Sequence, residues 1–463
     1  MKNINELIDC NYDIDICGIT DDSRNVKSGF LFVATKGFNV DHYDYVENAI
    51  KNGCVFVIAD RDIKMNFPHI IVDKNINDFY REICQKYYDL DFNQLRLIGI
   101  TGTDGKTTTA TIVKNVIGNC SYMGTNGLEI FNEKYSVNNT TPVISELYEN
   151  LKKIIDMNCS TLSMEVSSES LLHDRVKNLQ YDIVAITNIT GDHLNVHRTF
   201  DNYVRCKLKL LDLVRENGFV VLNGDDDVLS NIHVSNCIKF GFCDNNDYVI
   251  TNYLEDDKYT RIYLNHDLEK IEIVSPLKAK YNIYNVVMAY IICKLYGIGE
   301  DIILNRIKNL KPIDGRLEVL DFGQDYDIIL DYAHTINGVK SVISSFQNYD
   351  RRIVVIGSAG GRDKEKRSVI GKYIIENSDV SIFTMDDPRN EDVNDIIDQM
   401  VGDSEDYIRI LDRGKAIQYA LDIADKGSVV LILGKGRDNY MAIGDKKVYY
   451  CDYDIIERYF KEK

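Results

Sequence analysis

The stretch Gly99-Ile100-Thr101-Gly102-Thr103-Asp104-Gly105-Lys106-Thr107-Thr108 is the sharpest local signal in this sequence. It follows a mostly apolar run over 95–100, and this order predicts a strand, a glycine-containing turn and a helix that opens with Lys-Thr-Thr. The N–H groups at such a helix start bind phosphate oxygens, the lysine neutralises them and the first threonine holds Mg²⁺. A strict phosphate-binding loop has glycine where this chain has Ile100, so the loop is a variant. Lys-Thr-Thr after two glycines argues against a turn that binds nothing, and the stretch predicts nucleotide binding.

Outward from this loop, apolar runs typical of strands alternate with helical stretches along most of the chain. The runs with the clearest strand character lie at 30–34, 55–59, 95–100, 183–186, 219–222, 328–330, 353–356, 380–383 and 429–432. Between the first two we expect a loop over 37–42 and a helix over 45–52. Strands separated by helices predict a parallel sheet and an α/β fold. Because a polar segment at 89–94 and the pair Lys311-Pro312 interrupt the pattern, we predict three domains, over 1–94, 95–311 and 312–463.

The overall charge limits the partners that the chain can have. Its 463 residues carry a formal net charge of −18, and the resulting field repels duplex nucleic acid and anionic membranes. A local cationic pocket is compatible with this average. The 11 cysteines form no C-x-x-C pair, which indicates free thiols in a reducing compartment. Neither a signal peptide nor an apolar run long enough to span a membrane is visible, so we expect a cytoplasmic protein without membrane insertion.

Acidic and imidazole side chains follow two other predicted strands. Glu165 comes directly after Leu162-Ser163-Met164, and Asp192-His193 come after the strand at 183–186. The carboxyl ends of parallel strands meet at one edge of a sheet, where a carboxylate and an imidazole can share a divalent ion beside a nucleotide. Taken singly, Glu165 also fits a solvated strand end, and His193 fits a residue at a helix start. Their recurrence beside a phosphate loop favours the metal interpretation without deciding it.

Further motifs follow in a fixed order from about residue 20 to residue 440. They are Asp22-Ser23-Arg24, Phe30-Leu31-Phe32-Val33-Ala34 leading to Gly37, Asp41-His42, Asn139-Thr140-Thr141-Pro142, Glu165-Val166-Ser167-Ser168, Asp192-His193-Leu194, Gly315-Arg316, Asp331-Tyr332-Ala333-His334-Thr335, Gly360-Gly361-Arg362-Asp363-Lys364, Asp386-Asp387-Pro388-Arg389 and Gly434-Lys435-Gly436. Together with the phosphate loop, this series resembles the Mur ligase family and, within it, the UDP-N-acetylmuramoyl-tripeptide synthetases. The resemblance covers nearly the whole chain.

The resemblance implies a fold and a reaction. The fold is α/β with three domains: a central parallel-sheet, P-loop-type ATP-binding domain, an amino-terminal α/β UDP-binding domain and a carboxy-terminal Rossmann-like domain that binds the incoming amino acid. ATP phosphorylates the terminal carboxylate of a UDP-N-acetylmuramoyl-dipeptide, the amine of an amino acid attacks the acyl phosphate, and phosphate leaves. Because anions meet in this reaction, Lys106, Arg316, Mg²⁺ and the loop amides would offset their repulsion.

The resemblance also assigns residues to catalysis, to Mg²⁺ and to ATP. Lys106, Glu165, His193 and Lys207 form the catalytic set, and the metal ligands are Thr107, Glu165, His193 and Lys207 as a carbamate formed from CO₂. A solvated helix lysine is the alternative for Lys207, because only its position distinguishes it from Lys209. Asn282 and Asn285 are expected near the base and Asp331 at the ribose. The ATP contacts in full are Gly102, Thr103, Asp104, Gly105, Lys106, Thr107, Thr108, Asn282, Asn285, Arg316 and Asp331.

A third set of residues is assigned to the substrates. It consists of Ser23, Arg24, Asn139, Thr140, Thr141, Ser167, Arg175, Arg362, Asp386, Asp387, Arg389, Gly434 and Asp438. Arg362 and Arg389 match arginines that hold carboxylates in the diaminopimelate enzymes, and a bidentate guanidinium suits the second carboxylate that lysine lacks. A surface arginine after a turn proline is the alternative for Arg389. Two departures from the family pattern fall here: Asp387 replaces the usual Asn, adding a negative charge that suits an ammonium group, and Arg437-Asp438 replaces His-Glu.

We therefore expect an ATP-dependent amide ligase that adds meso-diaminopimelate, or otherwise L-lysine, to UDP-N-acetylmuramoyl-L-alanyl-D-glutamate in peptidoglycan precursor synthesis. Its expected partners are that UDP-linked peptide and the diamino acid, and we expect a monomer that binds no nucleic acid. A divergent paralogue, as in archaeal pseudomurein synthesis, is the alternative within the family. A non-catalytic nucleotide-binding subunit is the alternative outside it, and the joint presence of Lys106, Glu165, His193 and Lys207 argues against that hypothesis.

Overall fold

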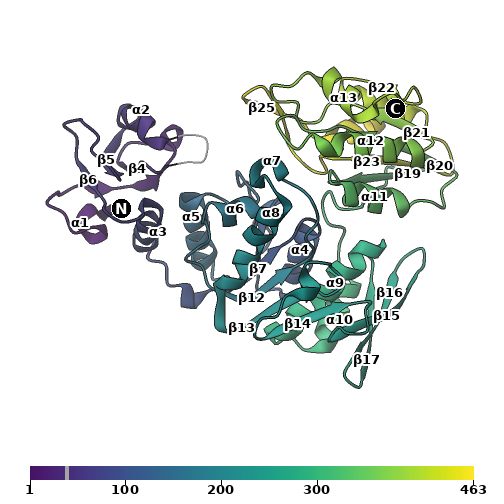
Figure 1. Cartoon of the computed structure of the whole chain (residues 1–463), viewed down its shortest axis with the longest axis horizontal. Helices are drawn as coiled ribbons and strands as arrows, with labels where there is room; N and C mark the ends of the chain where they lie inside the picture. Colours follow the sequence, from purple (N-terminus) through teal and green to yellow (C-terminus); the bar gives the residue numbers. More distant parts are fainter. Residues whose placement is uncertain (37–40, 463) are drawn as a thin grey trace. The chain divides into compact units, whose positions relative to one another are not determined.

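The computed structural model describes residues 1–36 and 41–462 (Figure 1). Gly37, which belongs to the amino-terminal motif, lies outside the described residues, as does most of the loop predicted over 37–42. Strands and helices alternate through the described chain, which confirms the predicted α/β class. Within these residues, no helix is both long and apolar enough to cross a membrane.

The amino-terminal residues form a small parallel sheet with helices. Their elements are β1 (Lys2–Asn3), α1 (Ile4–Leu7), β2 (Asp15–Ile16), β3 (Gly18–Thr20), η1 (Ser23–Asn25), β4 (Phe30–Val33), η2 (His42–Tyr45), α2 (Val46–Lys51), β5 (Cys54–Ala59), β6 (His69–Ile71), α3 (Ile76–Tyr87) and η3 (Phe92–Gln94). The sheet has the strand order β3-β4-β5-β6, and each neighbouring pair is parallel. Leu31 and Val33 of β4 pack in one hydrophobic core and Phe32 in another, because alternate side chains of a strand point to opposite faces.

The middle of the chain contributes to a sheet of eleven strands. The elements are β7 (Arg96–Thr101), α4 (Lys106–Ile117), β8 (Ser121–Gly124), β9 (Gly127–Ile130), β10 (Glu133–Tyr135), α5 (Ile144–Asp156), β11 (Thr161–Glu165), α6 (Ser168–Leu172), β12 (Tyr181–Ile186), α7 (Leu194–His197), α8 (Phe200–Leu208), η4 (Lys209–Leu213), β13 (Val214–Asn223), η5 (Leu229–Asn231), β14 (Cys237–Gly241), β15 (Tyr248–Glu255), β16 (Thr260–His266), β17 (Glu269–Ser275), α9 (Lys280–Tyr296) and α10 (Glu300–Lys308). The strand order is β10-β9-β8-β11-β7-β12-β13-β14-β15-β16-β17.

This sheet is parallel only in part. β8 with β11, β13 with β14 and β14 with β15 are parallel pairs, as the sequence predicts. At the two edges, β8-β9-β10 and β15-β16-β17 are antiparallel, which the sequence analysis did not anticipate. These strands follow one another through short turns without helices, and a short turn permits only antiparallel pairing.

The carboxy-terminal residues form a separate six-stranded sheet. Its elements are β18 (Glu318–Leu320), β19 (Asp327–Asp331), α11 (Ile336–Ser344), β20 (Arg351–Ile356), α12 (Glu365–Asn377), β21 (Val380–Phe383), α13 (Val393–Val401), β22 (Ile408–Arg409), α14 (Arg413–Asp422), β23 (Ser428–Leu433), β24 (Tyr440–Ile443), β25 (Lys446–Tyr449) and α15 (Asp452–Glu462). The strand order is β18-β19-β23-β20-β21-β22, with only the edge pair β18–β19 antiparallel. β24 and β25 form a separate hairpin.

Two hydrophobic cores cover the faces of this six-stranded sheet. Ile329 and Leu431 belong to one core and Ile328 and Ile432 to the other, so the fully buried strands are covered on both sides. Asp331 at the end of β19 pairs with Leu433 at the end of β23. Because the parallel strands end together, the loops that follow them lie at one edge, where open α/β sheets place their sites.

A buried ion pair joins two helices beside this sheet. Arg413 at the start of α14 donates through Nε and Nη2 to the two carboxylate oxygens of Asp452 at 2.8 and 2.7 Å, and both side chains are 0% exposed. Removing one charge leaves the other buried without its counter-ion. We expect Asp452→Asn to lower the free energy of unfolding by about 3 kcal/mol. Chemical denaturation measures this loss, and Glu457→Gln, which breaks a surface pair with Lys461 on the same helix, should cost under about 0.5 kcal/mol. Equal losses in the two variants would contradict the prediction.

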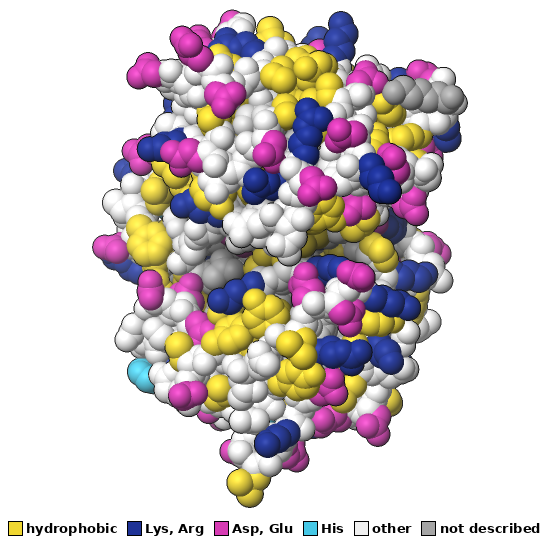
Figure 2. Space-filling view, turned by 90° about the vertical axis from the view of Figure 1, so that its right-hand side faces the viewer, with side chains coloured by type: hydrophobic (Ala, Val, Ile, Leu, Met, Phe, Trp, Pro, Cys, Tyr) yellow, Lys and Arg dark blue, Asp and Glu magenta, His cyan; other side chains and the backbone are white. Residues whose placement is uncertain are grey.

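The described chain divides into two compact units. One consists of 1–99, 118–184 and 206–218, and the other of 100–117, 185–205 and 219–463. The domain boundaries expected near residues 94 and 311 remain predictions. On the face drawn in Figure 2, Lys and Arg side chains are interspersed with Asp and Glu side chains.

Candidate active site

The phosphate loop lies between β7 and α4, as predicted. Gly102 and Gly105 have φ angles of +148° and +85°, and both are in close contact with other segments. A Cβ atom on Gly102 would lie 1.8 Å from Oγ1 of Thr187, and one on Gly105 would lie 2.3 Å from Oδ1 of Asn285. Only glycine fits these two positions without a shift of the neighbouring segments. Ile100, which departs from the strict pattern, is fully buried in β7 and lies before the turn.

Lys106 is the first residue of α4, and its side chain lies over the loop. Its Nζ donates to the carbonyl oxygens of Gly102 and Thr103 at 2.9 and 2.8 Å. The N–H groups of Thr103 and Asp104 donate to Asn188, so these two amides hold the loop in place. The first N–H groups of α4 have no acceptor within the helix, and with Lys106 they provide the donors that fit a phosphate.

The predicted ATP contacts Asn282 and Asn285 lie on α9, on the side facing the phosphate loop. Nδ2 of Asn285 donates to Oδ1 of Asn282 at 3.0 Å, and Oγ1 of Thr109 is 3.4 Å from Oδ1 of Asn285. Thr108, also predicted to contact ATP, is buried in the first turn of α4. The two asparagines therefore share one polar cluster with the helix that follows the loop.

Arg316 and Asp331 come from the carboxy-terminal part of the chain. Nη2 of Arg316 donates to Oγ1 of Thr107 at 2.8 Å, which places a guanidinium at the start of α4. Asp331 accepts the N–H groups of Leu317 and Ala333, each at 2.7 Å. Burial raises the pKa of Asp331, and the nearby Arg316 opposes that rise. Asp331 thus stabilises the turns at Leu317 and Ala333 by accepting their main-chain N–H groups.

Two more contacts join the phosphate loop region to later segments. Oγ1 of Thr335 donates to the carboxylate of Asp104 at 3.1 and 3.2 Å. Nζ of Lys366 lies 3.5 Å from Oδ1 of Asp192. The structure therefore brings loop residue Asp104 together with the motif at 331–335, a pairing that the order of motifs does not reveal.

His193 directly precedes the short helix α7 in the left-handed conformation, with φ of 55°. Burial lowers the pKa of its imidazole to about 4, although the carboxylate of Asp192 opposes this shift. For Asp192 itself, burial raises the pKa, but His193 and Lys366 outweigh it and the pKa is lowered. At neutral pH the His193 ring is therefore uncharged, which is the form that binds a metal ion.

Glu165 is fully buried at the end of β11, within the other unit. Its carboxylate accepts the hydroxyl of Tyr122 at 2.5 Å, the N–H of Thr125 at 3.0 Å and the hydroxyl of Thr125 at 3.3 Å. The hydroxyl of Thr140, a predicted substrate contact, lies 3.1 Å from that of Thr125. Glu165 is therefore a hydrogen-bonded carboxylate and not a solvated strand end.

The predicted peptide-binding residues gather beside Glu165. Oγ1 of Thr141 donates to the main-chain oxygen of Glu165 at 2.8 Å and accepts the N–H of Ser167 at 2.9 Å. Nη1 of Arg175 donates to the main-chain oxygen of Thr141 at 3.0 Å, and burial lowers the pKa of Arg175. Asn139 is exposed next to this cluster. The two motifs at 139–142 and 165–168 thus form one hydrogen-bonded unit.

Lys207 lies on α8 and is 2% exposed. Lys209, two residues later, has a side chain that is 48% exposed and contacts the main-chain oxygen of Leu171 and the carboxylate of Asp174. The alternative of a solvated helix lysine therefore describes Lys209 and is wrong for Lys207.

The two amino-terminal residues assigned to substrate differ in their surroundings. Ser23 is buried at the start of η1, and its main-chain oxygen accepts Nδ2 of Asn52 at 2.8 Å. The side chain of Arg24 is 86% exposed and pairs with Asp22 at 2.7 Å. Hydrogen bonding with Arg24 lowers the pKa of Asp22, so Arg24 has an anionic partner within the chain.

Arg362 and Arg389 lie on the loops that follow β20 and β21. Nη1 of Arg389 donates to the main-chain oxygen of Gly360 at 2.8 Å, and a Cβ atom on Gly361 would lie 3.8 Å from the same nitrogen. Burial and the neighbouring Arg362 both lower the pKa of Arg389. The structure thus brings the two predicted carboxylate-binding arginines near each other, and Arg389 is not an isolated surface residue.

The remaining carboxy-terminal site residues surround Lys435. Its Nζ lies 2.9 Å from Asp387, 3.7 Å from Asp386 and 3.6 Å from Asp438, and a Cβ atom on Gly434 would lie 2.9 Å from Asp386. Burial lowers the pKa of Lys435, but the three carboxylates outweigh it and the pKa is raised. The ammonium group that Asp387 faces is therefore that of Lys435, within the chain.

Several residues that contact the predicted site residues had no role of their own in the predictions. Asn188 is one, although the stretch Thr187-Asn188 also resembles the metal segment of the family. Lys435 belongs to the motif Gly434-Lys435-Gly436, but no role was predicted for its side chain. Tyr122 carries no local signal, because its contact with Glu165 joins positions 43 residues apart.

Within residues 1–36 and 41–462, no group of three or more His, Cys, Asp or Glu residues forms a ready metal cluster. A buried carboxylate, a neutral imidazole and the Thr107 hydroxyl are nevertheless suitable Mg²⁺ donors.

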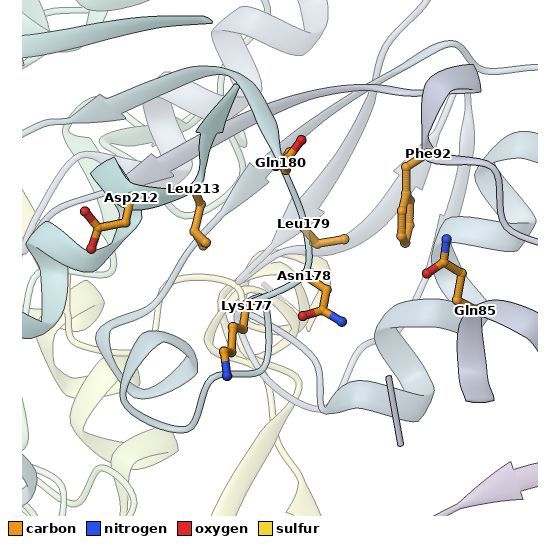
Figure 3. Close-up of a pocket in the computed structure, with 8 residues that line it drawn as sticks. All are labelled: Gln85, Phe92, Lys177, Asn178, Leu179, Gln180, Asp212 and Leu213. Atoms are coloured by element: carbon orange, nitrogen blue, oxygen red, sulfur yellow. The ribbon is translucent and has the colours of Figure 1, made fainter. Parts of the chain in front are cut away.

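A cavity of about 540 Å³ lies elsewhere in the first unit (Figure 3). It is lined by Gln85, Phe92, Lys177, Asn178, Leu179, Gln180, Asp212 and Leu213. No predicted site residue is among them, so the cavity is not part of the candidate active site.

Comparisons with known proteins identify the family to which the chain belongs. Sequence models described as "Mur ligase family, catalytic domain", "Mur ligase middle domain" and "Mur ligase, glutamate ligase domain" match residues 15–87, 100–293 and 315–436. A UDP-N-acetylmuramoyl-L-alanyl-D-glutamate--2,6-diaminopimelate ligase of Fusobacterium nucleatum subsp. nucleatum is 35% identical, over 98% of this chain and 95% of the relative. A UDP-N-acetylmuramoyl-L-alanyl-D-glutamate--L-lysine ligase of Staphylococcus epidermidis is 32% identical, over 96% of this chain and 93% of the relative.

Solved structures share the fold. The crystal structure of MurF ligase from Thermotoga maritima in complex with ADP has a TM-score of 0.67 at 19% identity, and the match covers 96% of this chain and 97% of that one. The family models and the curated relatives span nearly all of the described residues. The chain therefore belongs to the Mur ligase family, with its three-domain α/β fold, and is an ATP-dependent ligase.

Proposed function

We propose that this ligase joins meso-diaminopimelate to UDP-N-acetylmuramoyl-L-alanyl-D-glutamate, with ATP as the phosphoryl donor, in cytoplasmic peptidoglycan precursor synthesis. L-Lysine is the second candidate for the amino acid, and the active species is a monomer. The observation that carries the proposal is the similarity, over nearly the whole chain, to curated ligases whose names give this acceptor. Both amino acids occur among those names, and the proximity of Arg362 and Arg389 favours the one with two carboxylates.

In the first step, an oxygen of the terminal carboxylate attacks the γ-phosphorus of ATP, and the bond from that phosphorus to ADP breaks. Negative charge accumulates where the two anions meet, and preorganised donors in a partly dry site lower that barrier. We assign this work to Lys106, Arg316 and the first amides of α4. The contact between Arg316 and Thr107 supports the assignment, because it holds a second cation at the helix start.

In the second step, the amino nitrogen attacks the acyl carbon of the acyl phosphate. The bond from that carbon to the phosphate oxygen breaks, the nitrogen loses a proton, and an amide, ADP and phosphate result. We assign the acceptor to Ser23, Arg24 and the cluster of Asn139, Thr140, Thr141, Ser167 and Arg175. The amino acid is assigned to Arg362, Asp386, Asp387, Arg389, Gly434 and Asp438.

Mg²⁺, when bound, neutralises phosphate charge and polarises the γ-phosphoryl group. We assign it to Thr107, Glu165, His193 and a carbamylated Lys207. The buried, hydrogen-bonded carboxylate of Glu165 and the neutral ring of His193 support this donor set. The burial of Lys207, in contrast to Lys209, supports the choice of lysine.

Phosphate release measured with each substrate omitted in turn tests the proposed reaction. We expect release only when ATP, the UDP-linked dipeptide and a diamino acid are all present, and a panel of amino acids then ranks diaminopimelate against lysine. Nucleotide binding without turnover would instead support a non-catalytic subunit. Turnover with equal rates across the panel would support a paralogue that acts on another UDP-linked peptide.

Removing the Arg389 guanidinium is expected to weaken the preference for diaminopimelate. Charge-assisted hydrogen bonds of this kind contribute about 1.5–3 kcal/mol, so Arg389→Ala should lower the ratio of kcat/KM for diaminopimelate over lysine by roughly tenfold or more. Competition between the two amino acids at a fixed concentration of UDP-linked dipeptide measures the ratio. Arg409→Ala is the matched control, because that arginine pairs with Asp398 at the surface of the same sheet. An unchanged ratio in Arg389→Ala would disprove this role.

A further inference from the structure

Two loops of the carboxy-terminal sheet touch through their main chains. The β20 loop (residues 357–364) carries Arg362, and the β21 loop (residues 384–392) carries Arg389. The N–H of Gly360 donates to the oxygen of Asp387 at 2.8 Å, and a Cβ atom on Gly360 would lie 2.0 Å from the oxygen of Pro388. The close approach requires glycine at position 360, and it places the two arginine-bearing segments against each other.

Arg367 and Glu391 lie behind this contact. Arg367, on α12, is 0% exposed and donates through Nη1 to Glu391 at 2.9 Å and to Gln399 of α13 at 2.7 Å. Its Nη2 donates to the oxygen of Ala359 in the β20 loop at 3.0 Å. Glu391, in the β21 loop, accepts the N–H of Gly361 at 2.6 Å. The pair therefore connects both loops to the helices α12 and α13 (Figure 1).

Glu391 is a strong anchor because it stays ionised. Its hydrogen bond with Arg367 is the main reason that its pKa is lowered to about 2, and the N–H of Gly361 and the ammonium of Lys364 add to this effect. A carboxylate that accepts both a backbone N–H and a buried guanidinium forms charge-assisted hydrogen bonds, which are shorter and stronger than neutral ones. Arg367 in turn has its charge compensated inside the fold.

Arg389 needs such support because of its surroundings. Its φ angle of 51° is in the left-handed region, which is unfavourable for a residue other than glycine. Its N–H donates to Ala442 of β24 at 2.9 Å, and its oxygen accepts the N–H of Gly444 at 2.8 Å. Arg362 lies near enough to repel it electrostatically. Two like charges stay close together only when the surrounding structure holds them there.

We propose that Arg367 and Glu391 form a positioning pair that fixes the spacing of Arg362 and Arg389, and so sets the affinity for an amino acid with two carboxylates. The effect that this pair has on catalysis rests on the function proposed above. Neither residue of the pair is assigned to the substrate, so their effect acts through the two arginines. A carboxylate pair at a fixed separation is recognised best by guanidinium groups that are already at that separation.

The test compares Glu391→Gln with a matched variant, Asp379→Asn. Asp379 lies at the opposite end of the same two strands, and it also accepts a backbone N–H, that of Arg352 at 2.8 Å, and a guanidinium nitrogen at 3.3 Å. We expect Glu391→Gln to speed amide hydrogen exchange over residues 359–362 by about tenfold and to raise the KM for diaminopimelate by about tenfold. The KM values for ATP and the UDP-linked dipeptide should stay unchanged, and Asp379→Asn should leave exchange at 359–362 and all three KM values unchanged.

A second variant covers the case in which Glu391→Gln fails to fold. Glu391→Asp keeps the charge beside Arg367 but shortens the side chain, so it cannot reach Gly361 and Arg367 together, and we expect smaller shifts in the same direction. Unchanged exchange at 359–362, or faster exchange with an unchanged KM for diaminopimelate, would overturn the proposal. If the unmodified protein turns over no diamino acid, the proposed function fails, and the exchange measurement alone still decides whether the pair holds the loop.

Discussion

Replacement of Lys106 by methionine is expected to lower phosphate release by about a thousandfold at saturating substrates. The ammonium of Lys106 lies over the phosphate loop at hydrogen-bond distance from two of its carbonyl oxygens, where a transferring phosphoryl group would need a cation. Removing one preorganised donor from such a site costs about 10²–10³ in rate, and here the donor is also a full charge. Methionine keeps most of the length of the side chain and removes the charge. Single-turnover measurement of phosphate formation reports the loss directly.

The control for this prediction is Lys152→Met. Lys152 is a partly exposed lysine of α5 that forms an ion pair with Asp156, so its loss should change phosphate release by less than twofold. Thermal unfolding of both variants separates lost chemistry from lost stability, since Lys106→Met also removes two hydrogen bonds within the loop. Retention of more than a tenth of the parent rate in Lys106→Met would show that the phosphates bind elsewhere.

Lys207→Ala is expected to reduce turnover by on the order of a thousandfold, because an anion that holds Mg²⁺, as proposed for the carbamate, would supply several kcal/mol of transition-state stabilisation. The proposed carbamate would form by attack of the uncharged amine on CO₂ with loss of a proton, which would convert a side chain that repels Mg²⁺ into one that can bind it. Lys207 is the lysine chosen for this role because it is only 2% exposed, whereas the side chain of Lys209 is 48% exposed. The measurement is phosphate release by the variant with and without short-chain carboxylic acids, which should restore part of the activity.

The matched control is Lys209→Ala, two residues away. Its half-exposed side chain contacts Asp174 at 3.5 Å, and its removal should leave turnover within twofold of the parent. Depletion of CO₂ and bicarbonate should lower the activity of the parent and leave Lys207→Ala unchanged. Full activity in Lys207→Ala, without any response to added carboxylates, would refute the carbamate.

The sequence predicts the strands of this fold best where they are buried on both faces. β19, β20, β21 and β23 read as short apolar runs between glycine- or aspartate-containing loops, and they occur within one or two residues of the predicted ranges. The hairpins β8-β9-β10 and β15-β16-β17 were missed, because polar or small residues interrupt their apolar residues and leave no continuous apolar run. Their antiparallel pairing follows from the short turns that connect them, and an apolar run does not indicate how long the next turn is.

For the candidate site, local motifs identify residue types but not partners. The glycines at 102 and 105 could be predicted to permit an unusual turn, whereas the collisions that exclude other residues come from Thr187 and Asn285, far along the chain. The charge of Asp387 was visible, but its neutralisation by Lys435 depends on the loops after β21 and β23, two strands that β20 separates in the sheet. Contacts of this kind arise from tertiary packing and cannot be derived from spacing alone.

The hairpin β24–β25 holds the main chain of Arg389 by two hydrogen bonds, from its N–H to Ala442 and from the N–H of Gly444 to its oxygen. These two hydrogen bonds do not depend on the side chain of residue 389, because both use its main-chain atoms. The backbone of the β21 loop can therefore keep its conformation when the guanidinium of residue 389 is replaced by another group. In evolutionary terms, if Arg389 has its proposed role, a change in the amino acid that such a ligase accepts would require few substitutions and no new fold. Relatives named for diaminopimelate and for lysine accordingly stand at similar identity to this chain, 35% and 32%.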